Sequence, residues 1–522
     1  MLYSKNYEAV CPLILLQILT IFVVYLGRDT SLFSPLAVTH KFRSGPVYMS
    51  TNGEIPNVEP LNNSVISILR EAIRGSNRDF TKGPIGLGIF LLAVPMILEM
   101  SMESLFAIVD IFFVAKLGAD AIAIVGLTES VMALIYAVAF GFAIGATATV
   151  ARRTGEKDIA GAARSATHVI YCGVIVSLLI SAIGIIFAPD ILTLLGAKPH
   201  IIAEGSLFMR IMVGGNAAVL FIFLLNAIFR GAGDAAIAMR VLILANGLNI
   251  ILSPCFIFGV AFFPELGVTG AAVGTTIGRS VGVIYAAWHL FRVGGRIHLD
   301  RESWRFDPTL LWKLVKLSST GVFQLLIATA SWTALMPIIA GFGEVAIAGY
   351  VIALRVVMFA LLPALGLSNA AATMVGQNLG AGKPERSEAA VWKAAWFNMA
   401  IYFGIGVVFW LFSNQIIGLF TQEPEVLRYG TSALHIIAYG FAFYGLGMVL
   451  ETAFNGAGDT WTPTYLNLLV FWVFEIPAAY TLAYYFELGP DGVFWAITIA
   501  FSLLAVASGL LFRRGKWKLK TV

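Results

Sequence analysis

The stretch Phe229-Arg230-Gly231-Ala232-Gly233-Asp234 recurs 225 residues later as Phe454-Asn455-Gly456-Ala457-Gly458-Asp459. Other landmarks follow in the same order. Leu117-Gly118 matches Phe342-Gly343 at the same offset, and Glu265-Leu266-Gly267 matches Glu487-Leu488-Gly489 at an offset of 222. Self-similarity at a fixed spacing is the signature of a repeated structural unit. The chain therefore consists of two tandem halves with the same fold.

Each half consists of membrane-spanning segments. The chain is 59% hydrophobic and only 12% charged, with a mean hydropathy of +0.85, whereas soluble domains carry about 25% charged residues. Only helices and closed barrels span a membrane, and the apolar blocks lack the alternation of a barrel strand. We predict twelve helices, near residues 85–115, 121–149, 164–188, 203–229, 235–260, 268–291, 312–341, 345–373, 388–412, 428–454, 463–485 and 491–512.

The two halves are expected to have the same orientation, because each contains an even number of spans. This predicts an all-α polytopic membrane protein in which two six-helix bundles are related by a pseudo-two-fold axis along the membrane normal. We assign residues 82–296 to the N-lobe and 297–522 to the C-lobe with its basic tail. Two bundles that flank a central cleft are typical of alternating-access transporters.

Lysine and arginine gather in alternate connections, which sets the orientation of the spans. The basic connections hold Arg152, Arg153, Lys157, Arg164, Arg230, Arg240, Arg292, Arg296, Arg301, Arg305, Lys313, Lys316, Lys383, Arg386 and Lys393, and the C-terminal tail continues the series. Positive connections remain in the cytoplasm. The pattern predicts a multi-pass protein of the cell inner membrane, with both ends of the core in the cytoplasm.

Residues 1–81 form an N-terminal extension of different composition. An apolar run at 9–27 is either a signal-like segment or an extra span. Residues 65–75 are amphipathic and carry arginines, which suits a helix that lies on the membrane surface. A polar leader follows Met49. Our hypothesis is that the native start is Met49 and that residues 1–48 are dispensable.

The sequence contains no motif for catalysis, metal chemistry or nucleotide binding. Its three cysteines are scattered, and its six histidines form no metal-binding spacing. The glycine-rich segment 376–383 has the wrong spacing for a phosphate-binding loop, and Pro384 stands where a serine or threonine is needed. We therefore expect no enzyme, no cofactor, and neither nucleotide nor nucleic acid as a partner. Transport by this chain alone must be driven by an ion gradient.

Three carboxylates lie in the first span, at Glu99, Glu103 and Asp110. At about 100° per residue they lie within roughly 40° of one another and form one acidic stripe. Charges inside spans are costly and usually functional. Pro95 precedes them and is expected to bend the helix. The stripe predicts a moving part that responds to protonation or to a bound cation or substrate; the alternative is that Asp110 is merely solvated near the outer end.

Neutral oxygen donors lie on the fifth and sixth spans, at Asn249, Ser253 and Thr275. Together with Asp110 they can form a small site for a hard cation such as Na⁺. Helix packing through polar side chains is the alternative. The second half lacks an acidic stripe, and its candidate polar residues are Gln324, Arg355, Glu451 and Glu475.

The duplicated Gly-Ala-Gly-Asp motif, the segment Val375-Gly376-Gln377-Asn378-Leu379-Gly380-Ala381-Gly382, and Pro95 with Val109-Asp110 resemble the multidrug and toxic compound extrusion (MATE) family, bacterial type. The resemblance covers about residues 82–515. It implies a twelve-helix antiporter that exports cationic or amphipathic organic compounds by alternating access, in exchange for Na⁺ or H⁺, with no other cofactor. Membrane lipids are its surroundings, and we expect a monomer.

The resemblance also carries roles for individual residues. It implies ion coupling through Asp110, fifteen residues after Pro95, with Asn249, Ser253 and Thr275 as partners. Some relatives have Asp or Asn where this chain has Ser253, which leaves the ion preference open. A seventh-span glutamate of some branches is replaced by Ala328. The alternative function is a flippase for lipid-linked or polysaccharide substrates of the wider superfamily, which would need a basic cavity.

Overall fold

The computed structural model describes residues 65–292 and 294–521. The chain divides into two units, Met1–Asn63 and Ser64–Val522, and only the second is described below. The apolar run at 9–27 and the hypothetical start at Met49 lie outside the described residues.

The described part of the first half is helical. Its helices are α2 (Val65–Arg74), α3 (Ile85–Val114), α4 (Ala119–Gly155), α5 (Ile159–Leu194), α6 (Pro199–Gly214), α7 (Asn216–Ala232), α8 (Ala235–Phe258) and α9 (Val268–Phe291). A short 3₁₀ turn, η1 (Ala115–Leu117), follows α3. The predicted span at 203–229 is divided into α6 and α7 at Gly215, which is next to a second glycine and lowers the local helix propensity.

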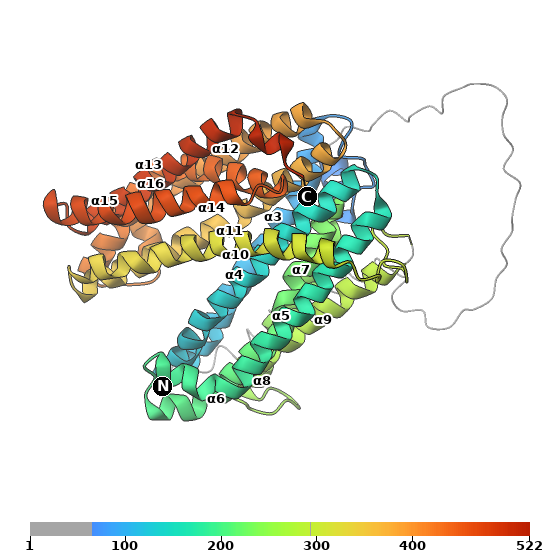
Figure 1. Cartoon of the computed structure of the whole chain (residues 1–522). Helices are drawn as coiled ribbons and strands as arrows, with labels where there is room; N and C mark the ends of the chain where they lie inside the picture. The colour runs from blue at the N-terminus through green and yellow to red at the C-terminus, as the bar shows by residue number, and fades with distance from the viewer. Residues whose placement is uncertain (1–64, 293, 522) are drawn as a thin grey trace, which may run out of the picture. The chain divides into compact units, whose positions relative to one another are not determined.

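The second half repeats this order of helices. It contains α10 (Pro308–Ala340), α11 (Glu344–Gly380), α12 (Pro384–Gly418), α13 (Pro424–Gly456), α14 (Trp461–Asn467), η2 (Leu468–Glu475), α15 (Ile476–Tyr480), η3 (Thr481–Tyr485), α16 (Pro490–Arg513) and η4 (Lys516–Leu519). The predicted span at 463–485 differs from a plain helix because η2 and η3 are π-helical. Figure 1 shows α12, α13 and α16 in one bundle and α5, α7 and α9 in the other.

The predicted all-helical membrane fold is confirmed. In the described part of the chain, eleven segments are long and apolar enough to cross a membrane. The twelfth predicted span is present as α9, which is 24 residues long but carries Thr275, Thr276 and Arg279. Several helices run beyond the predicted apolar limits; α11 ends at Gly380 rather than near residue 373. Helix-forming residues continue past the apolar core, so hydropathy alone underestimates these lengths.

The two bundles meet where α3 and α4 pack against α10 and α11. Small residues allow this approach. A methyl group on Gly141 of α4 would lie 2.5 Å from the backbone nitrogen of Val322 in α10, and one on Gly366 of α11 would lie 2.5 Å from the backbone of Ile97 in α3. Such close backbone contact between membrane helices requires glycine at the crossing point.

Gly141→Ala is therefore expected to force α4 and α10 apart and to lower the apparent melting temperature of the purified protein. Gly126→Ala, on the same helix, is the matched control, because nothing lies within 4 Å of the methyl group that it would add. Alanine is the better helix former, so the control should be neutral or stabilising. Thermal unfolding of both variants in the same detergent tests this; equal melting temperatures would contradict it.

One end of the described structure, which we call the basic end, carries Arg152, Arg296, Lys383 and Arg386. Hydrogen bonds between the bundles occur there. Thr373 of α11 donates to the carbonyl of Arg230 at 3.2 Å, and Gln377 donates to the carbonyl of Gly231 at 2.9 Å. The bundles are therefore joined at the basic end through direct contacts of α7 and α11.

The helix α2 matches the amphipathic segment predicted at 65–75. Ala72 is buried and Ile68 packs against the core, while Val65 and Ile66 are 73% and 70% exposed. The exposed pair is consistent with the predicted position on a membrane surface, which remains a prediction.

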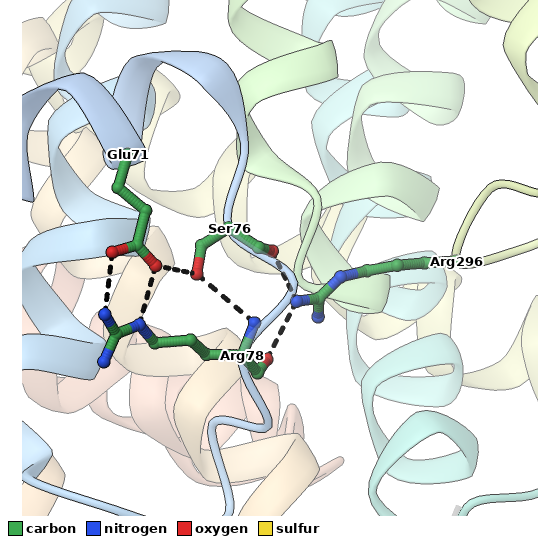
Figure 2. A network of polar contacts seen from close by, with 4 residues as sticks. All are labelled: Glu71, Ser76, Arg78 and Arg296. Carbon is green, nitrogen blue, oxygen red and sulfur yellow. Dashed lines mark hydrogen bonds and ion pairs between the residues drawn. The ribbon is translucent and has the colours of Figure 1, made fainter. Parts of the chain in front are cut away.

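A polar network fixes the chain after α2. Glu71 accepts two hydrogen bonds from Arg78 at 2.6 and 2.8 Å and one from Ser76 at 2.7 Å (Figure 2). The bonds from Arg78 hold the pKa of the Glu71 carboxyl below its usual range. The network turns the chain sharply at the basic end and directs it into α3.

Candidate functional site

A cavity of about 660 Å³ lies between the two bundles. Its walls come from α3, α4, α6, α7 and α9 of the first half and from α10, α11 and α13 of the second. The wall is mostly apolar, with methionine and aromatic side chains at Met100, Met132, Met212, Met358, Met448, Phe106, Tyr136, Phe140, Phe208 and Phe223. Flexible thioethers and aromatic rings adapt to ligands of different shape.

The cavity is closed toward the basic end and open in the other direction. Arg230, Ala372 and Asn455 line it near the basic end and are at most 6% exposed. Glu129 and Met358 line it farther from that end and are exposed. The cavity is thus accessible from one end of the described structure.

Two of the three predicted stripe carboxylates have arginine partners. Glu99 is fully buried and bonds Arg230 at 2.6 Å and Asn226 at 3.0 Å. Glu103 bonds Arg279 at 2.7 Å and Asn246 at 3.0 Å. The structure therefore brings the first-span acids to one face, as predicted, but Glu99 and Glu103 are ion-paired. Arg230, which the sequence analysis placed in a basic connection, lies inside α7 and is 4% exposed.

Arg279 is held beneath the cavity wall. It is fully buried, and its guanidinium lies 5.1 to 5.9 Å from the ring centres of Phe106, Tyr136 and Phe223. Cation–π contacts of this kind stabilise a desolvated arginine. Arg279 is one helical turn after Thr275 on α9, so both face α3 and α8. A fixed positive charge therefore stands next to Glu103.

Asp110 is the stripe carboxylate that lacks an arginine bond. It lines the cavity, and its Oδ1 is buried without a hydrogen-bond partner in the part of the chain described. The charges of Glu129 and Arg279 act on it. Pro95 lies inside α3, fifteen residues earlier, and helix α3 continues through it. Because proline has no N–H, one carbonyl of the preceding turn loses its helical donor, and the helix is easier to bend there.

The predicted neutral partners of Asp110 lie on neighbouring faces of α8 and α9. Asn249 donates to the Thr275 hydroxyl at 2.7 Å, and Thr275 lines the cavity. The hydroxyl of Ser253 is buried and has no partner among the described residues. Of the four predicted ligands, Asp110 and Thr275 line the cavity, whereas Asn249 and Ser253 do not. In the described residues no three His, Cys, Asp or Glu side chains form a metal-binding group.

The second half contributes two of its predicted polar residues to the cavity. Gln324 and Glu451 line it, and each has a buried side-chain oxygen without a partner among the described residues. Arg355 is exposed on α11, and its charge acts on Glu129. Glu475 does not line the cavity: it is fully buried at the end of η2. The structure thus brings Gln324 and Glu451 to the site of Asp110 but not Glu475.

The sequence analysis did not predict that three further charged residues take part in the site. Glu129 lines the cavity, Arg230 neutralises Glu99, and Arg279 neutralises Glu103. A signal for Arg279 existed, because it lies four residues after Thr275 and so shares its helix face. The spacing in the sequence does not indicate that Arg230 turns inward from the end of α7.

The cavity contains carboxyl groups that no arginine pairs. Glu103 is bonded to Arg279, and the lining residue Arg230 is bonded to Glu99. This leaves Asp110, Glu129 and Glu451 as lining carboxylates without an arginine hydrogen bond in the described residues. An apolar cavity with such acids favours a ligand that is both amphipathic and positively charged.

The profile of the MatE family matches residues 95–255 and 322–481. The two matches fall one in each half, in agreement with the internal repeat, and together they span more than half of the chain.

Named relatives and solved structures agree with this match. The chain is 26% identical to a protein of Thermotoga maritima named probable multidrug resistance protein NorM, over 83% of this chain and 93% of that protein. It is 24% identical to the multidrug export protein MepA of Staphylococcus aureus, over 83% and 94%. A structure described as the outward-facing conformation of a multidrug resistance MATE family transporter superposes with a TM-score of 0.80 and 27% identity, covering 85% of this chain and 98% of that one.

Proposed function

We propose that this chain, which belongs to the MatE family, is a secondary antiporter for organic cations. It exports cationic or amphipathic organic compounds by alternating access, and H⁺ or Na⁺ moves in the opposite direction. The names of its relatives as multidrug resistance and multidrug export proteins support the same substrate class. The proposal is for transport and not for catalysis.

The observation that carries the proposal is the acidic, apolar cavity between the bundles. Asp110, Glu129 and Glu451 face a space lined by methionine and aromatic side chains. Asp110 and Glu451 each have a buried carboxylate oxygen without a partner among the described residues; such a group is costly, so it binds a cation or a proton. Competition between a coupling ion and an organic cation for Asp110 links the two fluxes, because only one of them neutralises the carboxylate at a time.

The flippase alternative is disfavoured by the same charges. A phosphate headgroup needs free arginine or lysine side chains in the cavity. The lining arginine, Arg230, is bonded to Glu99, and Arg279 is bonded to Glu103. An anionic headgroup would therefore meet carboxylates rather than guanidinium groups.

We further propose the orientation of the protein. Since positive connections remain inside, the basic end faces the cytoplasm of the cell, and the protein lies in the inner membrane. The cavity then opens outward. We propose that the protein acts as a monomer, because each chain contains both bundles and the whole cavity.

Ethidium efflux from the cytoplasmic side tests the function. In inverted vesicles that contain the protein, ethidium uptake is expected to depend on an imposed proton or sodium gradient, with the two gradients applied separately. The coupling ion is the one whose gradient, imposed alone, drives ethidium uptake. Gradient-independent movement of ethidium, or transport of an anionic lipid analogue but not of ethidium, would contradict the antiporter.

A further inference from the structure

The duplicated Gly-Ala-Gly-Asp motif lies at the basic end, and the transport proposal leaves it without a role. Each copy ends a helix in the same way. Gly233 and Gly458 both have φ of +83°, a left-handed conformation that favours glycine. The amides of Asp234 and Asp459 each donate to the carbonyl five residues earlier, at 2.8 and 2.9 Å. This turn stops the helix and leaves carbonyl groups of the motif free to accept from other parts of the chain.

One motif carbonyl in each copy accepts from an arginine. Arg296 donates to the carbonyl of Ala232 at 3.2 Å, and Arg152 donates to the carbonyl of Ala457 at 3.5 Å. Ala232 and Ala457 are equivalent positions of the repeat. A cation is favoured at a helix C-terminus, where the carbonyls carry partial negative charge. The arginines are not equivalent: Arg152 is near the end of α4, and Arg296 follows α9.

Each arginine also holds one end of the described chain. Arg296 donates to the carbonyls of Ser76 and Arg78 at 2.6 and 2.8 Å, as Figure 2 shows. Arg152 donates to the carbonyl of Lys520 at 2.5 Å. Charge-assisted hydrogen bonds are stronger than neutral ones. Each guanidinium thus joins a motif carbonyl to a terminal segment.

The terminal segments continue these links across the bundles. Beyond Arg78, Lys383, which immediately precedes α12, donates to the carbonyl of Thr81 at 2.8 Å, and Arg386 of α12 donates to that of Lys82 at 2.8 Å. The N-terminal segment is therefore bound by Arg296, which follows the first bundle, and by α12 of the second.

The C-terminal segment makes the corresponding link. The ammonium of Lys520 lies 3.1 Å from the carboxylate of Asp459, the motif aspartate of the second bundle. Its carbonyl is held by Arg152 of the first bundle. The neighbouring Trp517 is fully buried, which anchors the segment.

We propose that Arg152 and Arg296 are positioning residues of the cytoplasmic gate. Arg152 of the first bundle bonds the motif of the second bundle directly, and Arg296 joins the motif of the first bundle to the N-terminal segment, which Lys383 and Arg386 of the second half also bind. These contacts hold the two bundles together and are released when the basic end opens. An inward-facing state requires the bundles to separate where these contacts lie. The contacts of Arg152 and of Arg296, which we call the two arginine clamps, therefore set the balance between the outward-open and inward-open states. The inference rests on the proposed alternating access and orientation.

A cysteine reporter at the junction of the bundles measures the gate without any substrate. Ser318 of α10 is 1% exposed and faces Gly145 of α4 across the junction. We would measure the rate at which a membrane-impermeant maleimide labels the full chain with Ser318→Cys. The labelling rate of the chain without this substitution is the background. Arg152→Gln is expected to raise this rate at least about tenfold, through the loss of its charge-assisted bonds.

Arg153→Gln is the matched control for Arg152→Gln. It removes the same charge one residue away, where Arg153 is bonded to Glu156 of its own helix end at 3.0 Å. The control should leave the Ser318→Cys rate unchanged. Arg296→Gln is expected to act like Arg152→Gln, with Arg292→Gln as its control, because Arg292 is exposed and packs on Trp288.

A second reporter separates gating from loss of structure. Ala133 is exposed and lines the cavity on the side away from the basic end. When the gate opens, labelling of Ala133→Cys should fall while that of Ser318→Cys rises. If both rates rise, or if Arg152→Gln and Arg296→Gln label like their controls, the clamps do not set the gate. Because labelling needs no ethidium, this result is independent of the efflux experiment.

Discussion

Asp110→Asn is expected to reduce gradient-driven ethidium efflux to the level of vesicles without the protein. Asparagine has nearly the shape of aspartate but neither binds a proton nor carries a charge. Asp110 lines the cavity with an oxygen that has no partner among the described residues, unlike Glu99 and Glu103. Under the proposed mechanism, the variant loses the group for which the coupling ion and the organic cation compete.

Asp190→Asn is the control for this variant. Asp190 is exposed on α5 of the same half and does not line the cavity, so the identical chemical change should leave efflux unaltered. Asp110→Asn should also elute and melt like the parent protein, since no ion pair of Asp110 is broken. Gradient-dependent efflux of Asp110→Asn at the parent rate would refute the role of Asp110.

The architecture could be predicted from the sequence because its determinants are local and repeated. Apolar segments of spanning length and the duplicated motif at 229–234 and 454–459 set the number and order of the helices. The division of the fourth span at Gly215 and the π-helical turns of the eleventh were not predicted. Both are local departures from regular helix geometry that hydropathy does not detect.

The site was only partly predictable, because burial and pairing depend on the packing of distant segments. Helical spacing placed Glu99, Glu103 and Asp110 on one face of α3. It could not tell which of them meets an arginine, since Arg230 and Arg279 lie 131 and 176 residues away from their partners in sequence. For the same reason Glu475 and Glu451 were equivalent candidates in the sequence, although only Glu451 lines the cavity.

The largest expected loss of stability comes from breaking the Glu99–Arg230 pair. Arg230→Met leaves Glu99 buried with Asn226 as its remaining hydrogen-bond donor among the described residues. Removal of one partner of a buried ion pair costs about 3–5 kcal/mol. The variant should therefore melt several degrees below the parent protein in detergent. Arg240→Met is the control, because Arg240 bonds only backbone carbonyls of α2 in the described structure.

The double variant Glu99→Leu/Arg230→Met separates the cost of an unpaired charge from the value of the pair itself. If the single variant is unstable because Glu99 is left without its counter-ion, removal of both charges should restore most of the melting temperature. If the arginine instead stabilises α7 by packing, the double variant should be as unstable as Arg230→Met. Recovery of the melting temperature would mean that Arg230 is needed only to neutralise the buried charge of Glu99. Asp110, which lacks such a partner, would then be the first-span acid left free to exchange ions.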